Sequence, residues 1–130
     1  MGKTFPETRL NKMDAASQKD ELGTLLKGSP IVVKKAVTAD ATGELAITIP
    51  YDMEVIDVIV QCTAANGSGS LQLKNGTAVT DAIACTTDKA IARAGSIDDA
   101  YSTLLTTDTV TVDANGASDR GIMWIIGYRI

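Results

Sequence analysis

The sequence predicts an all-β protein, a sandwich or barrel of about eight short strands that follows a polar N-terminal arm. Three observations support this prediction. Apolar and polar residues alternate over several short segments, as they do in strands with one buried face. Asn-Gly pairs at 66–67, 75–76 and 115–116 lie between these segments, where hairpin turns need a positive φ. Thr and Val are abundant, whereas the chain has only one Trp, three Tyr and one Phe, so aliphatic side chains must fill the core.

The chain divides at Gly28-Ser29-Pro30 into an arm, residues 1–29, and a β-sandwich domain, residues 30–130. Residues 1–35 contain seven Lys and Arg and four Asp and Glu, whereas residues 36–130 contain five Lys and Arg and twelve Asp and Glu. These charges, +3 and −7, sum to the net charge of −4. The acidic body argues against nucleic acid as a partner, because phosphate binding needs clustered Lys and Arg.

Targeting signals are not recognisable in the sequence. No segment reaches the roughly 20 apolar residues of a membrane span, and the N-terminus lacks the apolar run of a signal peptide. We therefore expect no membrane partner and synthesis in the cytoplasm, where Cys62 and Cys85 should remain free, buried thiols, with a disulfide as the minority alternative. Two cysteines without any histidine do not make a tetrahedral zinc site, and we expect no cofactor.

The arm contains one segment that favours a helix. Residues 14–27 are mostly good helix formers, with Asp14 placed to cap the start and Gly28 placed to end it. Fourteen residues are marginal as an isolated helix, so this segment should become ordered when it docks on another surface, or else packs on its own domain. Its thin apolar stripe consists of Met13, Leu22, Leu25 and Leu26.

The body is expected to consist mainly of strands. In residues 44–49, for example, Leu45, Ile47 and Ile49 fall on one face. Two segments, 78–84 and 96–101, break this rhythm and predict short helices at the corners of the sandwich, the second capped by Ser96 with Asp99. The other predicted strands are 31–38, 54–62, 70–74, 89–93, 109–113 and 121–130.

The last predicted strand and the strand at 54–62 are apolar on both faces. Such a strand needs a partner subunit or further cover from its own chain, and the corner helices are the alternative cover. We expect a homo-oligomer in which Trp124 is buried. The predicted subunit interface consists of Val55, Ile59, Met123, Trp124, Ile125 and Tyr128, with Val55 and Ile59 opposite the face of Ile56, Val58, Val60 and Cys62.

The sequence offers little that predicts catalysis. Without histidine there is no Ser-His-Asp triad. Asp98-Asp99, or Asp52 with Glu54 and Asp57, could supply the two carboxylates of a glycosidase, but these positions fit solvated or helix-capping charges better. Calcium bound by loop carboxylates stays open, although no spacing selects for it. We therefore expect a protein that is not an enzyme.

Three segments of the body, TAVTDAIA at 77–84, AGSIDDAY at 94–101 and ANGASDRG at 114–121, resemble the small jelly-roll decoration, or cement, proteins of tailed-bacteriophage heads. The resemblance covers about three quarters of the chain, residues 30–130. It implies an eight-stranded jelly-roll sandwich that forms homotrimers on the virion surface, with the arm contacting the major capsid protein. We expect the arm to make its contact through Lys3, Phe5, Arg9, Lys12, Met13, Leu22, Leu25 and Leu26, with the base of the trimer as the alternative contact surface.

Two other functions remain open from the sequence. The first is the receptor-binding or carbohydrate-binding head of a virion fibre, with the arm as its stalk or anchor. Sugar sites commonly use exposed aromatic rings, and outside the last strand only Tyr51 and Tyr101 are suitably placed. The second is an enzyme of the two-carboxylate kind.

Overall fold

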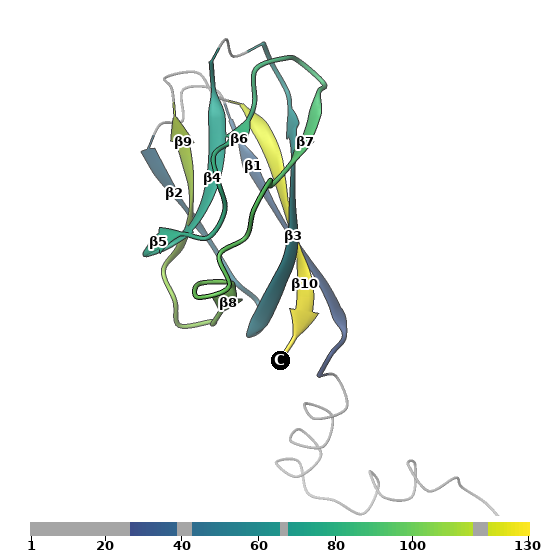
Figure 1. Ribbon diagram of the computed structural model, residues 1–130, viewed down its shortest axis with the longest axis vertical. Coiled ribbons are helices and arrows are strands. Elements are labelled where there is room, and N and C mark those ends of the chain that lie inside the picture. Colours follow the sequence, from purple (N-terminus) through teal and green to yellow (C-terminus); the bar gives the residue numbers. More distant parts are fainter. Residues whose placement is uncertain (1–26, 39–42, 66–67, 116–119) are drawn as a thin grey trace, which may run out of the picture.

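The computed structural model describes residues 27–38, 43–65, 68–115 and 120–130, and these residues form a β-sandwich of two antiparallel sheets (Figure 1). The described part contains no helix, which confirms the predicted all-β class. The predicted helix at 14–27 and the arm residues implied in capsid contact lie outside the described residues, apart from Lys27.

Sheet A is built around two long central strands. The order is β1-β10-β3-β7, with β8 also paired to β3. Strands β10 and β3 pair along almost their whole length, and β1 pairs with the other side of β10 from Pro30↔Tyr128 to Val37↔Gly121. The bounds are β1 Pro30–Val37, β3 Met53–Cys62, β7 Ile91–Arg93, β8 Thr103–Leu104 and β10 Gly121–Arg129.

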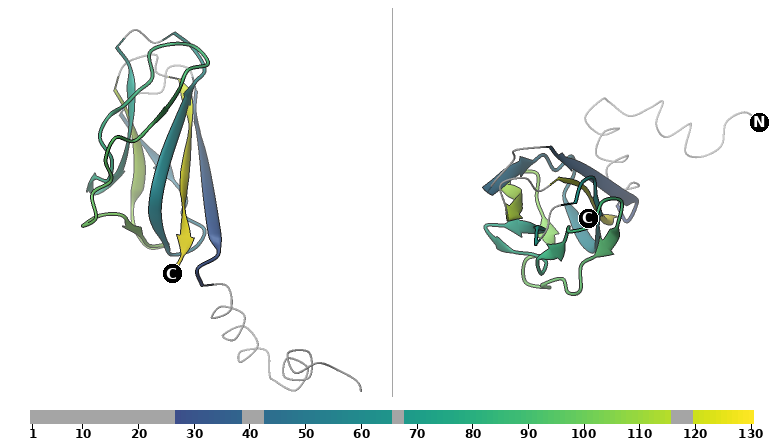
Figure 2. Two further views of the ribbon diagram at one scale, coloured as in Figure 1. Left: turned by 45° about the vertical axis from the view of Figure 1, so that its right-hand side comes forward. Right: turned by 90° about the horizontal axis from the view of Figure 1, so that it is seen from above.

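Sheet B faces sheet A across the core (Figures 1 and 2). Its order is β2-β9-β4-β5, with β6 also paired to β4. The bounds are β2 Gly43–Ile47, β4 Ser70–Asn75, β5 Thr77–Ala78, β6 Ile83–Ala84 and β9 Val110–Asn115. Each of the seven segments predicted as strands is a strand in the structure. With the two-residue pieces β5, β6 and β8 the described part has ten strands, so the predicted number of eight is not confirmed.

Aliphatic side chains from both sheets fill the core, as the composition requires. Sheet B contributes Leu71 and Leu73 from β4 and Val112 from β9, each fully buried. Sheet A contributes Met123 and Ile125 from β10, also fully buried. The two-residue alternation therefore predicts the inner faces of β4 and β9 correctly.

A β-bulge changes which residues of β3 face the core. In the register with β10, Ile126 pairs with Asp57 and Gly127 pairs with Val55, so Ile56 is the extra residue. Val55 is consequently buried in the core with Val58 and Val60, whereas Ile56 is exposed on the outer face. The two residues lie on opposite faces, as predicted, but each lies on the face that was predicted for the other. The bulge inverts the alternation because one inserted residue moves every earlier side chain to the other face.

The predicted short helices at 78–84 and 96–101 are wrong. Both segments are instead used in backbone pairing: β5 and β6 pair with β4, and Thr80 forms a bridge with Ile97. Asp81 Oδ1 accepts hydrogen bonds from the backbone N–H groups of Gly95 at 2.9 Å and Ser96 at 3.3 Å. Pairing across the sheet edge therefore outweighs the local helix propensity of these residues.

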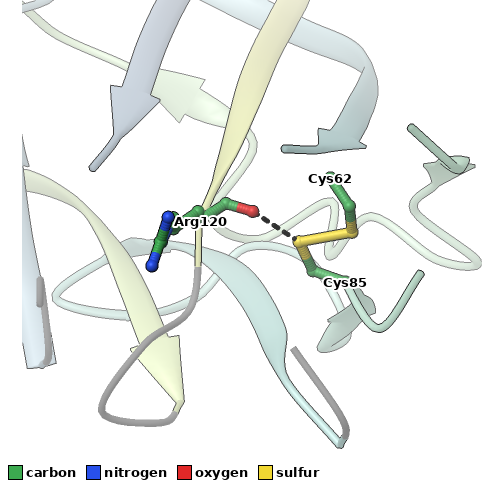
Figure 3. Close-up of a disulfide and its surroundings, with 3 residues drawn as sticks. All are labelled: Cys62, Cys85 and Arg120. Carbon is green, nitrogen blue, oxygen red and sulfur yellow. Dashed lines mark hydrogen bonds between the residues drawn. A yellow bond between two sulfur atoms is a disulfide. The ribbon is translucent and has the colours of Figure 1, made fainter. Parts of the chain in front are cut away.

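Cys62 and Cys85 form a disulfide, so the prediction of free thiols is wrong (Figure 3). Cys62 ends β3 in sheet A and Cys85 follows β6 in sheet B, and the fold brings their Cα atoms to 5.2 Å. Both cysteines are buried, and Cys85 Sγ lies 3.0 Å from the carbonyl oxygen of Arg120. The disulfide joins the two sheets at the end of the sandwich opposite the C-terminus, because Cys62 pairs with Gly121 at the start of β10.

One of the three Asn-Gly turns can be checked in full. Asn75-Gly76 joins β4 to β5, and Gly76 has a φ of 75°. A positive φ is the backbone conformation that glycine adopts without steric cost, so this prediction is confirmed. Residues 66–67 and 116 lie outside the described residues.

Gly127→Ala should unfold the chain more easily, because a Cβ at this position would overlap the backbone carbonyl of Glu54 beside the bulge. We expect a loss of about 3 kcal/mol in the free energy of unfolding, measured by urea denaturation. Gly43→Ala is the matched control: a Cβ added there would meet no other atom within 4 Å, and only the positive φ of 75° costs about 1 kcal/mol. Equal losses in the two variants would contradict the close approach at Gly127.

The double variant Cys62→Ala/Cys85→Ala should be less stable than the oxidised protein. The disulfide closes a loop with a sequence separation of 23, and removing such a cross-link releases about 3 kcal/mol of unfolded-state entropy. Calorimetry of both proteins measures the difference. Two results together would show that the disulfide does not form. The double substitution would leave the melting temperature unchanged, and reduction of the native protein under mild denaturation would leave it unchanged as well.

Candidate interaction surfaces

The outer face of sheet B is polar. Lys74 of β4 forms ion pairs with Glu44 of β2 at 2.7 Å and with Asp113 of β9 at 3.7 Å. The hydrogen bond to the Glu44 carboxylate raises the pKa of the Lys74 ammonium above its ordinary value. Gln72 lies on the same face, beside Asp113 in the register. This face is typical of a sheet that meets water.

The outer face of sheet A is apolar instead. The register aligns three rows of side chains across it: Val32 beside Ile126, Trp124 beside Ile59, and Ile122 beside Gln61, which in turn pairs with Ile91. Val32, Ile56 and Ile91 are 60%, 60% and 69% exposed, whereas Ile59, Ile122, Trp124 and Ile126 are half-buried. We call this surface the apolar flank, and it comprises Val32, Ile56, Ile59, Ile91, Ile122, Trp124 and Ile126.

Charged groups also lie on this face, on the outer strands β1 and β7 and, at Asp57, on the central strand β3 beside Ile126. Lys34 is exposed on β1 beside Trp124. Arg93 of β7 forms an ion pair with Asp57 of β3 at 2.6 Å. A largely apolar surface that also carries a few charges, one of them neutralised by an ion pair, is compatible with a protein–protein interface.

The structure separates the six residues of the predicted subunit interface into two groups. Val55, Met123 and Ile125 lie in the core between the sheets, which corrects the prediction for these three. Ile59, Trp124 and Tyr128 lie on the outer face of sheet A. Trp124 is half-buried in the single chain, so its predicted full burial would need cover from another copy. The sequence analysis did not identify Val32 and Ile91 as part of this surface, because the strand register is needed to show which residues lie beside them.

The end of the sandwich that carries the C-terminus (Figure 2) has a second group of exposed apolar side chains. It is formed by segments 27–29, 50–54, 99–108 and 128–130, which backbone hydrogen bonds tie together: Gly28 N–H donates to the Arg129 carbonyl, and Ile130 N–H donates to the Asp52 carbonyl. All three tyrosines of the chain lie here. We call this surface the tyrosine end, and its exposed members are Tyr51, Tyr101, Leu105, Tyr128 and Ile130.

Carboxylates fix the loop 99–108 at the tyrosine end. Asp52 Oδ1 accepts a hydrogen bond from Thr106 N–H at 2.8 Å, and Asp108 Oδ2 accepts one from Leu105 N–H at 3.0 Å. Glu54 accepts hydrogen bonds from the hydroxyls of Ser102 and Thr103, the latter at 2.6 Å. The loop is thus pre-organised, a condition that lowers the entropy cost of binding.

The candidate carboxylates of a glycosidase have structural partners in the described part. Asp52 and Glu54 fix the loop 99–108, and Asp57 pairs with Arg93. Asp98 Oδ1 accepts a hydrogen bond from Ala100 N–H at 2.9 Å. The sequence-based role of Asp99 as a helix cap has no counterpart, because no helix forms there.

A shallow pocket lies over β4 and the segments 78–81 and 96–98. Its polar lining residues are Gln72, Thr80, Asp81, Ser96 and Asp98, and its apolar ones are Ala78, Val79 and Ile97. None of its lining residues is aromatic, so neither Tyr51 nor Tyr101 contributes to it. Within the described residues, no group of three or more His, Cys, Asp or Glu side chains is placed to hold a metal ion.

Comparison with protein-family models, with curated proteins and with solved structures finds no match for this chain. The described ranges also contain no helix long and apolar enough to cross a membrane.

Val32→Asp should prevent self-association and leave the protomer folded. Val32 is largely exposed in the single chain, so the substitution should change the free energy of unfolding by no more than about 0.5 kcal/mol. A charge placed in an apolar interface should nevertheless raise the dissociation constant at least ~10-fold. Sedimentation velocity measures the change. Ala46→Asp, an exposed position on β2 of sheet B, is the matched control, and an equal effect of both substitutions would contradict a role for the apolar flank.

Proposed function

We propose that this chain is a structural virion protein, a decoration or cement protein that binds the head of a tailed bacteriophage as a homotrimer. The observation that carries the proposal is the apolar flank of sheet A, set against the ion-paired outer face of sheet B. A single protomer leaves this flank partly open to water, and burial by sister copies removes apolar area at roughly 25 cal/mol per Å². In the proposed trimer, Ile59 and Trp124 belong to this interface, whereas Tyr128 lies at the tyrosine end.

The proposed connectivity of the sandwich is that of a jelly roll. In a trimer with cyclic symmetry, equivalent surfaces of all three copies face the same way, so the three arms leave from one side. Gly28 lies at the tyrosine end, and the arm would therefore approach the major capsid protein from there. Many weak contacts repeated over a lattice then stabilise the shell by multivalency and mass action.

The second candidate is the receptor-binding or carbohydrate-binding head of a virion fibre. The exposed rings of Tyr51 and Tyr101 at the tyrosine end favour it, since aromatic faces stack on sugars. The guanidinium of Arg129 already stacks on one of these rings, with its central carbon 4.4 Å from the centroid of the Tyr51 ring. A glycan array that shows selective binding, lost in Tyr101→Ser, would favour this candidate over the decoration protein.

The decoration function is tested with heads of the phage that encodes the chain. The full chain should co-sediment with purified heads and raise the temperature at which they release DNA. The chain that begins at Pro30 retains all strands of the described sandwich and should remain an oligomer, but it should lose this binding. Failure of the full chain to bind heads would contradict the proposed function, and full binding by the truncated chain would contradict the role of the arm.

A further inference from the structure

The tyrosine end has an unbalanced charge as well as exposed apolar groups. Its segments carry four acidic side chains, Asp52, Glu54, Asp99 and Asp108, against two basic ones, Lys27 and Arg129, a balance of −2. Arg129 lies over the ring of Tyr51. Among the described residues, no cation lies over Tyr101, which is 43% exposed. A partner that fits this surface combines positive charge with apolar side chains.

The first thirteen residues of the same chain have this chemistry. They carry three basic side chains and one acidic, a balance of +2, and their sequence interleaves charges with apolar groups. Arg9 stands next to Leu10, and Phe5 follows Lys3 closely. The four apolar side chains are Met1, Phe5, Leu10 and Met13. The segment thus complements the tyrosine end in both charge and hydrophobicity.

The chain also delivers this segment to the right place. It enters the described structure at the tyrosine end, where Gly28 N–H donates to the Arg129 carbonyl at 2.6 Å. Two sheets about 10 Å apart, with strands spaced by about 4.8 Å, make this end roughly 20 Å wide. The fourteen residues that follow Met13 reach about 21 Å as a helix and at most about 48 Å when extended. Either distance is enough to cross the end.

We propose that residues 1–13 dock onto the tyrosine end of their own copy. The guanidinium of Arg9 stacks on the free ring of Tyr101, as that of Arg129 does on Tyr51, and Asp99 supplies the opposite charge. Phe5 and Leu10 cover Leu105, which the carboxylate-fixed loop presents at 38% exposure. Attachment through a short tether raises the effective concentration to the millimolar range, so weak contacts suffice. This docking does not depend on the decoration function, although a shell that binds the arm would have to displace it.

The docking is tested by limited trypsin digestion of the full chain, with cleavage after Arg9 and Lys12 followed by mass spectrometry. A synthetic peptide of residues 1–20 gives the rate for the undocked segment. The cleavage rate of a docked segment is proportional to the fraction of molecules in which the segment is undocked. We expect this rate to be about 10-fold lower in the full chain than in the peptide. Equal rates at both sites would overturn the proposal.

Variants at the tyrosine end identify the surface that protects the segment. Tyr101→Ser and Asp99→Lys both change exposed side chains, and each should raise cleavage after Arg9 toward the rate of the peptide. Ile91→Ser, on the apolar flank, should retain the full protection. Unchanged protection in both end variants would overturn the proposal. Thermal melting shows whether each variant is folded. If Tyr101→Ser does not fold, Asp99→Lys still tests the proposal.

Dilution separates docking on the same copy from docking on a second copy. Protection within one copy does not depend on concentration, so it should persist through about a hundredfold dilution. Protection that falls with dilution would place the segment on a neighbouring copy and contradict the proposal.

Discussion

The two long strands at the centre of sheet A are apolar on both faces, and this constraint governs the rest of the structure. Their inner face meets sheet B and is fully buried at Met123 and Ile125. Their outer face has no such cover within the described residues, and Trp124 remains half-buried there. Large exposed apolar patches are uncommon on monomeric proteins and usually mark an interface. The proposal of a multi-subunit structural protein follows from this surplus.

The strand positions could be predicted from the sequence because half-buried strands have a period of two. Leu45, Ile47 and Ile49 give that period without ambiguity, and the strands β2, β4 and β9 of sheet B lie where they were expected. The run from Val55 to Val60 contains only one polar residue, Asp57, so its period is ambiguous and the bulge at Ile56 could not be located. The bulge decides that Val55 belongs to the core, and the predicted subunit interface was wrong at that residue for this reason.

The other departures also concern contacts between residues distant in sequence. Residues 78–84 and 96–101 have helix-like composition, but pairing with β4 and across the Thr80–Ile97 bridge determines their conformation. Cys62 and Cys85 were predicted to be free thiols because a reducing compartment was expected. Their close approach depends instead on the way in which the two sheets stack. The tyrosine end was missed because its residues come from four separate segments. The spacing of three tyrosines along the chain gave no sign that they meet at one end.

The central claim is that copies of this chain cover the apolar flank. Trp124 is the only tryptophan and lies in the middle of that flank, so its fluorescence reports on the interface directly. Acrylamide quenching of the full chain should be weak at high protein concentration and should increase on dilution, as the flank becomes exposed to water. Strong quenching that does not depend on protein concentration would contradict the claim.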